Sequence, residues 1–302
     1  MKHVAVLMGG WSAEREVSLS SGEACVEALK RCGYTVSAVD VTQNIAAVLE
    51  QIKPDVCFNA LHGRYGEDGL IQGVLEIMGI PYTHSGVLAS SLAMDKPVAK
   101  TLFAAVGIRC AEGRIFTRKE IMDGASYPKP FVIKPLNEGS SVGVTILLEN
   151  ENRSLVDIPW TFGSEVLIET YIPGREIQVA VMGDHALGAV EIRPLGRFYD
   201  YEAKYTSGKA EHLVPAPLPN DRYEEVLELA LRAHQALGCR GVSRTDFRFN
   251  DTGDGSGDFY ILETNTQPGM TALSLVPGIA ANSGIGFEEL VRWMVEDASC
   301  DR

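Results

Sequence analysis

The sequence has no long hydrophobic run and no excess of basic residues. Its 302 residues include 27 lysines and arginines against 40 aspartates and glutamates, which gives a formal net charge of −13. A surface of that sign repels a phosphate backbone, so we expect no nucleic-acid partner. The first apolar run covers only residues 4–8, and no later run approaches the roughly 20 residues that cross a bilayer. We therefore expect neither an export signal nor a membrane partner.

Closely spaced cysteines are also missing. The six cysteines form no C-x-x-C motif and no compact pattern of the kind that cross-links small secreted domains, and they lie far apart in the chain: Cys25, Cys32, Cys57, Cys110, Cys239 and Cys300. This usage fits a reducing compartment, so we expect a cytoplasmic protein whose cysteines are structural or incidental.

The composition that remains is that of a folded globular protein. Hydrophobic residues make up 45% of the chain and charged residues 22%, which are ordinary values for such proteins. At roughly 150 residues per domain, the length predicts two or three domains. We expect the boundaries after residues 94 and 175, which gives domains at 1–94, 95–175 and 176–302.

The first domain alternates strand-like and helix-like segments. Strands are expected at 3–8, 35–41 and 55–61, and helices from about 12 to 31 and from 45 to 52. This βαβαβ order predicts a parallel sheet, at whose carboxyl edge ligands usually bind. The loops GGWSAEREVS and HGRYGEDG leave that edge. A short strand at 80–83 and a helix from about 95, with Pro97 in its first turn, are expected to lead into the second domain.

The rest of the chain is predicted to contain antiparallel strands, among them 130–135, 165–172 and a strand starting near 176. The segment 193–219 has no clear periodicity, and long aperiodic connections of this kind are often active-site lids. After it, an apolar stripe predicts a helix: Val226, Ala230, Ala233 and Leu237. The fold class is therefore α/β (α+β), with a parallel domain before the antiparallel ones.

A hairpin near the C-terminus carries the clearest candidate site. If the hairpin that starts at Ser243 is symmetric about the 254/255 junction, paired residue numbers sum to 509 and Asp246 faces Glu263. Asn265 then lies on the same face as Glu263, because side chains alternate along a strand. Three oxygen ligands without histidine or cysteine suit Mg²⁺. A solvent-facing edge hairpin is the competing explanation, slightly the more common for this motif alone. An EF-hand is excluded because its twelfth position would be Ile261.

Further polar residues could bind a nucleotide, although each has an ordinary structural explanation. The loop NEGSSVG follows Lys134 and could cover phosphates, but it could equally be a hairpin turn, since the chain has neither a Walker motif nor G-x-G-x-x-G. Glu169 and Glu176 could accept hydrogen bonds from adenine and ribose, yet salt bridges are the more common role of such residues. Glu14 could simply favour a helix N-terminus, and His62 could be a loop residue.

Taken together, the chain resembles the D-alanine:D-alanine ligases of the ATP-grasp superfamily. The resemblance runs in order through nine motifs: GGWSAEREVSLSSG, ALHGRYGEDG, MDKPVAK, VIKPLNEGSSVGV, VLIETYIPGREIQVAV, FYDYEAKY, RTDF, LETNTQPGMT and SLVP. It implies an ATP-grasp fold after the N-terminal βαβ domain, with ATP held between two antiparallel sheets. It also implies the joining of two D-alanines through an acyl phosphate, with ATP converted to ADP and phosphate, and a homodimer.

The resemblance implies how ATP and metal are bound. By this resemblance, Lys96 and Lys134 would contact the phosphates of ATP. Adenine would be held by Glu169, Thr170 and Ile172, and the ribose by Glu176. The implied metal ligands are Asp246, Glu263 and Asn265, which would hold two Mg²⁺ ions, with Mn²⁺ as a substitute. These three agree with the trio that the hairpin arithmetic selects. The chain differs from the usual family residues at four positions: Thr170, Tyr171, Thr264 and Gln267. We expect these differences to alter the affinity for the nucleotide and not the reaction.

The resemblance also implies how the substrates are handled. Glu14 would bind the ammonium group of the first D-alanine and would be linked to Ser140 and Tyr205. Arg244 and the Gly269 N–H would stabilise an oxyanion. The second substrate would be contacted by His62, Ser274 and Leu275 and by Lys204, which comes from the lid and also reaches phosphate.

Three other activities stay open on the sequence alone. A D-alanine:D-lactate ligase is the nearest, and Tyr205 argues against it because such relatives carry Phe at that place. Another ATP-grasp carboxylate–amine ligase would lack the paired N-terminal loops. A nucleotide sensor without catalysis would have little use for Arg244.

Overall fold

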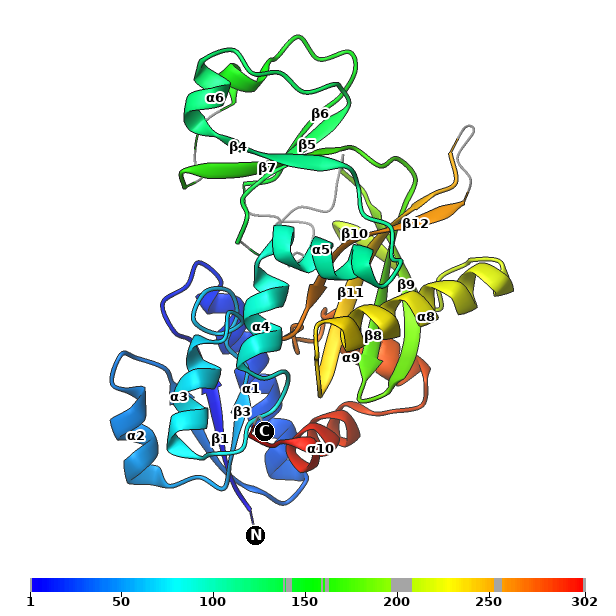
Figure 1. Cartoon of the computed structure of the whole chain (residues 1–302). Coiled ribbons are helices and arrows are strands. Elements are labelled where there is room, and N and C mark those ends of the chain that lie inside the picture. The colour runs from blue at the N-terminus through cyan, green and yellow to red at the C-terminus, as the bar shows by residue number, and fades with distance from the viewer. Residues whose placement is uncertain are drawn as a thin grey trace.

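The computed structural model describes residues 2–137, 139, 143–158, 160, 163–196, 208–252 and 257–300. Three predicted site residues, Ser140, Lys204 and Tyr205, lie outside the described residues. Within the described part, the chain forms one parallel sheet and two antiparallel sheets, with helices packed against them (Figure 1). The mixed α/β class predicted from the sequence is confirmed.

The N-terminal part has the predicted alternating order. Its elements are β1 (His3–Met8), α1 (Arg15–Arg31), β2 (Thr35–Asp40), α2 (Ile45–Ile52), β3 (Val56–Asn59), α3 (Leu70–Met78) and α4 (Val87–Met94). The three strands are parallel in the order β2-β1-β3. The strand expected at 80–83 is wrong: only Tyr82 forms bridges, one with Cys57 and one with Ser299. Pro81 has no N–H to donate, which keeps a longer ladder from forming there.

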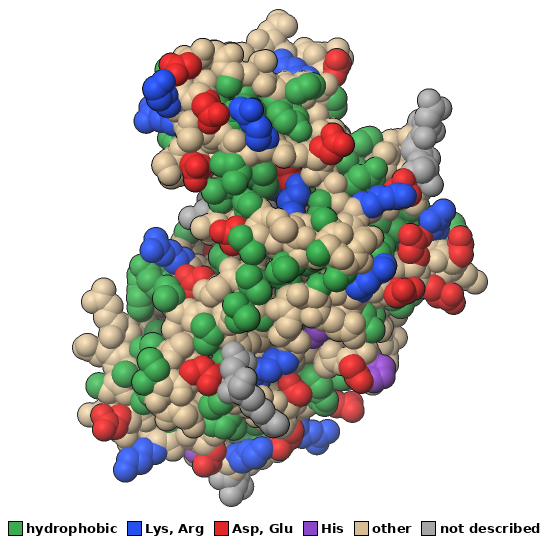
Figure 2. Space-filling model, in the orientation of Figure 1, with side chains coloured by type: hydrophobic (Ala, Val, Ile, Leu, Met, Phe, Trp, Pro, Cys, Tyr) green, Lys and Arg blue, Asp and Glu red, His purple; other side chains and the backbone are tan. Residues whose placement is uncertain are grey.

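The middle of the chain forms a small antiparallel sheet, as predicted. Helix α5 (Lys96–Ala105) comes first in the chain and packs against α4 below this sheet. The lobe that follows contains β4 (Gly113–Thr117), α6 (Arg118–Met122), β5 (Phe131–Lys134), β6 (Thr145–Leu147), the 3₁₀ helix η1 (Leu155–Asp157) and β7 (Glu165–Thr170). The strand order of this sheet, called the central sheet below, is β4-β7-β5-β6, so β7 lies inside it. In Figures 1 and 2 this lobe stands apart from the rest of the molecule above a narrower waist.

The C-terminal part is built on a larger antiparallel sheet of order β10-β9-β8-β11-β12. Its elements are β8 (Arg175–Met182), β9 (His185–Pro194), β10 (Ala210–Leu213), α8 (Asn220–Ala236), β11 (Val242–Asn250), β12 (Asp258–Asn265), α9 (Leu275–Asn282) and α10 (Phe287–Asp297). The apolar stripe predicted on α8 is buried against the sheet. The segment 193–219 is not structureless throughout, because β10 lies within it and pairs with β9.

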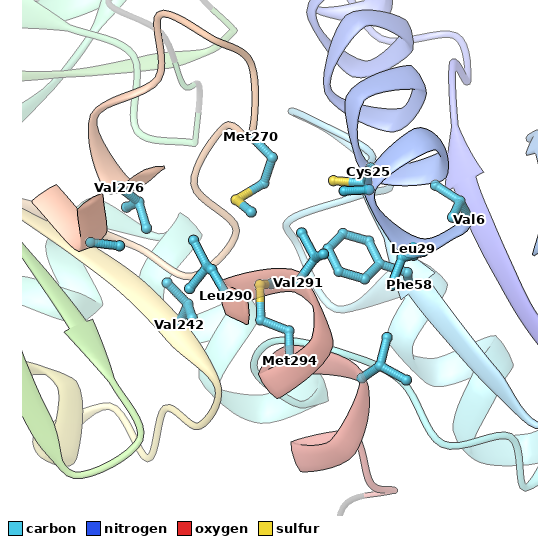
Figure 3. Packing of buried hydrophobic residues seen from close by; sticks show 14 of the residues in the cluster. Val6, Cys25, Leu29, Phe58, Val242, Met270, Val276, Leu290, Val291 and Met294 are labelled. Carbon is cyan, nitrogen blue, oxygen red and sulfur yellow. The ribbon is translucent and has the colours of Figure 1, made fainter. Parts of the chain in front are cut away.

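One core joins the N-terminal and C-terminal parts. Figure 3 shows Val6, Leu29 and Phe58 on one side and Leu290, Val291 and Met294 of α10 packed against them. The same cluster continues to residues of β8, β9, β11 and α9. Burial of this much apolar surface fixes the parallel sheet relative to the larger antiparallel sheet, so the loops at the ends of both sheets have a defined relative position.

The surface carries charges of both signs. On the face drawn in Figure 2, acidic and basic side chains are interspersed and do not separate into patches of one sign. Among the described residues, no helix is both long and apolar enough to cross a membrane.

Candidate active site

The hairpin of β11 and β12 brings the predicted metal ligands together. Asp246 pairs with Glu263 and Arg244 pairs with Asn265, as the sum of 509 predicts. Beyond Asp246 the register shifts, and Phe247 pairs with Ile261. The extra residue is a β-bulge, which increases the local twist of the strand that carries Glu263. The symmetric hairpin is therefore confirmed at its base and wrong toward its tip.

Each member of this trio already has a hydrogen-bond or charge partner. Arg244 donates to Asp246 through Nε (2.7 Å to Oδ1) and through Nη2 (2.9 Å to Oδ2). Lys96 Nζ lies 3.5 Å from Glu263 Oε2. The Gln267 N–H donates to Asn265 Oδ1 at 2.7 Å. The cations thus balance carboxylates that a divalent ion would otherwise neutralise.

The donors fit a hard cation by type. Two carboxylates and one amide oxygen on adjacent strands match the preference of Mg²⁺ for a few protein oxygens together with phosphates. In the described part of the chain, no group of three or more histidine, cysteine, aspartate or glutamate side chains is arranged to hold a metal. A metal at this trio would therefore depend on Asn265 and on oxygen atoms of the substrate.

A cavity next to the trio collects residues from distant parts of the sequence. Its walls come from the two N-terminal loops, the α4–α5 junction, the loop after β5, the hairpin and the segment after β12. The predicted site residues among them are Glu14, His62, Lys96, Arg244, Glu263, Asn265 and Gly269. Of the 13 described residues that line the cavity, seven are site residues predicted from the sequence.

A hydrogen bond joins the two N-terminal loops at this cavity. Ser12 Oγ donates to the His62 carbonyl oxygen at 2.7 Å. The ring of His62 is buried, with Nδ1 3.1 Å from Glu67 Oε1 and Nε2 3.1 Å from Ser21 Oγ. Glu14 is also buried, at the N-terminus of α1. A Cβ on Gly63 would lie 2.5 Å from Glu14 Oε2, so glycine is needed there for the carboxylate to fit.

A second group of charges lies on the central sheet. Glu169 on β7 forms ion pairs with Lys134, at 2.5 Å, and with Lys100 of α5. Burial raises the pKa of the Glu169 carboxyl, but the two lysines outweigh it and hold this pKa below its usual value. Burial also lowers the pKa of Lys96, and the nearby Glu263 opposes that shift. The ion pair thus brings Lys134 and Glu169, two residues that the resemblance assigns to ATP binding, into direct contact.

The other predicted nucleotide contacts lie at the edge between the two antiparallel sheets. The Thr170 N–H donates to the Glu112 carbonyl, and the Ile172 carbonyl accepts from Arg248. Glu176 accepts from Gln178 Nε2 at 3.1 Å. The Thr170 N–H is thus engaged within the protein, whereas the Ile172 carbonyl keeps a second lone pair.

Among the described residues, the predicted oxyanion donor Gly269 adjoins the predicted second-substrate residues Ser274 and Leu275. Ser274 is the N-cap of α9, and its Oγ accepts from the Thr271 N–H at 2.9 Å. A Cβ on Gly269 would lie 2.7 Å from Ser274 Oγ, so a larger residue there would require the Ser274 side chain to move. Leu275 follows at the first turn of α9 and packs against the shared core.

The sequence analysis assigned no structural role to three residues that organise the site. Lys100 lies one helical turn after Lys96, and the i, i+4 spacing could have revealed it. Glu67 follows His62 by five residues in the same loop. Gln267 is buried and joins the segment after β12 to the N-terminal part, through Asn59 and the Leu61 carbonyl. No local signal marks such a long-range amide contact.

The comparisons with known proteins agree with this geometry. Family models described as the N-terminus and the C-terminus of D-ala D-ala ligase match residues 44–85 and 102–296. The D-alanine–D-alanine ligase of Methylorubrum populi is 57% identical over 305 residues, covering 100% of this chain and 99% of the relative.

Solved structures are similar over the same length. The D-alanine–D-alanine ligase of Bacillus anthracis complexed with ATP superposes with a TM-score of 0.82 at 30% identity, covering 98% of this chain and 97% of the other. The VanG D-Ala:D-Ser ligase of Enterococcus faecalis gives 0.79 at 29% identity, covering 98% of both chains. The chain therefore belongs to the D-alanine–D-alanine ligase family, with the ATP-grasp fold and the ATP-dependent joining of two D-alanines as its activity.

Proposed function

We propose that the cavity beside the β11–β12 hairpin is where the two D-alanines and the phosphates of ATP meet. The observation that carries this proposal is that the N-terminal loops and Lys96 converge on one cavity with three residues of the hairpin, Arg244, Glu263 and Asn265. Asp246, Glu263 and Asn265 would hold Mg²⁺, which supplies neutralisation of phosphate charge when bound. Two ions, with Mn²⁺ able to replace them, are part of the proposal.

The first half of the reaction depends on positioning and positive charge. Glu14 binds the ammonium group of the first D-alanine, so that its carboxylate points toward the γ-phosphate. Lys96, Lys134 and Lys204 stabilise the phosphates during transfer to that carboxylate. The product is an acyl phosphate, and the proposed lid, 193–219, protects it from water. Ser140 and Tyr205 would complete the network around Glu14.

The second half needs a nucleophile and a place for negative charge. The amine of the second D-alanine, held by His62, Ser274 and Leu275, attacks the acyl carbon and phosphate leaves. The oxyanion that forms accepts hydrogen bonds from Arg244 and from the Gly269 N–H. Arg244 is well placed for this task because its contact with Asp246 fixes the guanidinium at the cavity wall. The adenosine of ATP would lie between the antiparallel sheets, at Glu169, Thr170, Ile172 and Glu176.

At the scale of the cell, we propose that the dipeptide supplies peptidoglycan precursor synthesis in the cytoplasm. We also propose three domains, 1–94, 95–175 and 176–302, and a homodimer. Leu70, Ile77 and Leu88 support the dimer, because these apolar side chains are exposed on the adjacent helices α3 and α4. Light scattering of the purified protein gives its mass directly, and a monomer at micromolar concentration would contradict the dimer.

The proposed site is tested by measuring phosphate release from ATP with and without D-alanine, over a series of Mg²⁺ concentrations. Release should require both, and chromatography should identify D-alanyl-D-alanine as the product. Release that proceeds equally well without added divalent metal would contradict the metal assignment. A product containing D-lactate or D-serine, formed in preference to the dipeptide from mixed substrates, would contradict the assignment of the second-substrate site.

A further inference from the structure

Helix α5 carries two lysines that reach carboxylates in two different sheets. Lys96 and Lys100 are one turn apart and lie on the same side of the helix. Lys96 Nζ is 3.5 Å from Glu263 on β12 of the larger antiparallel sheet. Lys100 forms its ion pair with Glu169 on β7 of the central sheet. The helix therefore lies between the two sheets whose edges form the proposed nucleotide site.

The Glu169 carboxylate is shared by two cations, one on each oxygen. Lys100 binds Oε1 and Lys134 binds Oε2. Lys100 is also fixed from the other side, because its Nζ donates to the Ala111 carbonyl at 2.6 Å. The side chains of Glu169 and Lys134 are 5% and 9% exposed, so neither charge is well hydrated. Gly113 makes room for Glu169, since a Cβ there would lie 2.8 Å from its Cγ.

These contacts set two requirements on Lys134. In the structure it neutralises Glu169, whereas the proposed function requires it to bind a phosphate of ATP. Moving the ammonium group to phosphate would leave a buried carboxylate without a cation if Lys134 were its only partner. An uncompensated buried charge is strongly unfavourable, so that exchange needs a second cation at Glu169.

We propose that Lys100 is this second cation: it stays on Glu169 when Lys134 moves to the nucleotide, and it thereby makes Lys134 available to phosphate. Lys100 is thus a positioning residue, which acts through Glu169 and Lys134 and touches no substrate. This inference rests on the proposed role of Lys134. It assigns a function to the second lysine of the KPVAK segment, which the reaction itself does not use.

The test compares ADP with adenosine, which has the same base and sugar but no phosphate for Lys134. Binding of both is measured by calorimetry on the full chain, for Lys100→Met, Lys100→Gln, Lys100→Arg and Lys134→Met. Lys119→Met is the control, because Lys119 is exposed on α6, in the lobe that carries Lys134 and Glu169, and pairs only with nearby Asp123 among the described residues. Thermal unfolding of each variant checks the fold, and the glutamine variant serves if the methionine variant does not fold.

We expect Lys100→Met and Lys100→Gln to raise the dissociation constant for ADP by about tenfold, within the usual range for two coupled binding events. Adenosine binding should change by less than about twofold, since adenosine does not draw Lys134 away. Lys100→Arg should restore most of the ADP affinity, because it keeps the positive charge.

An equal loss for ADP and adenosine would overturn the inference, because Lys100 would then only support the base site. An unchanged ADP affinity in both charge-removing variants would overturn it as well. The Lys134→Met variant distinguishes a failure of this inference from a failure of the proposed function. If Lys134→Met weakens ADP binding and loss of the Lys100 charge does not, only the inference is wrong. If Lys134→Met leaves ADP binding unchanged, the phosphate role of Lys134 is wrong and the inference with it.

Discussion

At the residue scale, three acidic side chains of the site are each matched with a cation before any ligand arrives. Asp246 contacts Arg244, Glu263 lies near Lys96, and Glu169 binds two lysines. Burial makes such matching necessary, because an isolated buried charge is far less stable than a paired one. A chain with a net charge of −13 thereby gathers cations where anionic substrates must bind.

The first prediction concerns the metal. Glu263→Gln keeps the shape of the side chain but removes a negative oxygen, so turnover at limiting Mg²⁺ should fall by orders of magnitude while the fold survives. Initial rates over a Mg²⁺ series and a circular dichroism spectrum measure both. Glu224→Gln, on the exposed side of α8, is the matched control and should behave as wild type. Near wild-type turnover of Glu263→Gln at limiting Mg²⁺ would remove Glu263 from the metal site.

The second prediction concerns Arg244. Arg244→Met should lower kcat by roughly 100-fold or more, the scale for loss of an oxyanion donor, with a smaller effect on the KM for ATP. Steady-state kinetics in both substrates separate the two parameters. Arg244→Lys keeps the charge but not the paired contact with Asp246, and should fall between wild type and Arg244→Met. A normal kcat with only a raised KM would assign Arg244 to substrate binding instead.

How much of the site could be predicted depends on how local its geometry is. Asp246 and Glu263 could be placed opposite each other because a hairpin has a period of two and a near-symmetric turn. The bulge between Asp246 and Phe247 has no such rule, so the outer pairs were displaced by one residue. Gln267 and Asn59 meet across 208 positions of sequence, and no local pattern encodes that contact.

At the scale of elements, one helix could be predicted from the signals at its start, and two others lack such signals. The helix beginning near residue 95 could be predicted, since Asp95 and Pro97 mark its start. Helices α3 and α4 went unpredicted. Their N-cap residues are Gly69 and Gly86, which supply no side-chain cap, and Gly69 has a positive φ of 93°. Both helices form because their apolar residues pack against the core, which is a tertiary effect.

The third prediction concerns the cap of α5. Asp95 accepts a hydrogen bond from the Val98 N–H at 3.1 Å. Asp95→Ala should lower the free energy of unfolding by about 1 kcal/mol, the usual value of such a cap, and Asp95→Asn should retain most of it. Urea denaturation of the three proteins measures the difference. Because the cap fixes the helix that carries Lys96 and Lys100, ADP affinity should fall in the alanine variant too. An alanine variant as stable as the wild type would show that the cap contributes nothing.

At the scale of the whole molecule, the N-terminal and C-terminal parts meet around the start of β11, where two histidines are buried. His84 approaches the Val242 carbonyl, with Nδ1 at 3.4 Å, and His234 Nδ1 lies 2.7 Å from Ser243 Oγ. Burial lowers the pKa of each histidine to about 4. Both side chains are therefore neutral in the folded protein at pH values where the unfolded chain already binds protons.

The sign of the resulting pH dependence follows from these pKa values. Above the unfolded pKa of about 6.5 both states are neutral at these positions, and the full stability is present. As pH falls from 6.5 toward 4 the unfolded state takes up protons that the folded state excludes. Stability should therefore decrease by at most about 1.4 kcal/mol per pH unit for each histidine, and these terms should level off below pH 4.

The last prediction tests this dependence with urea unfolding at pH 7.5, 6.5, 5.5 and 4.5. The denaturation midpoint should fall steadily below pH 6.5 in the wild type. The His234→Gln side chain can still donate to Ser243 but does not titrate. The denaturation midpoint of this variant should therefore fall less steeply as the pH is lowered, even if the midpoint at pH 7.5 is below that of the wild type. His185→Gln is the control, since His185 is exposed at the start of β9 and its replacement should leave the slope as in the wild type. Parallel slopes for wild type and His234→Gln would mean that the junction around β11 opens to water before the protein unfolds, and that His234 is not excluded from protonation in the folded state.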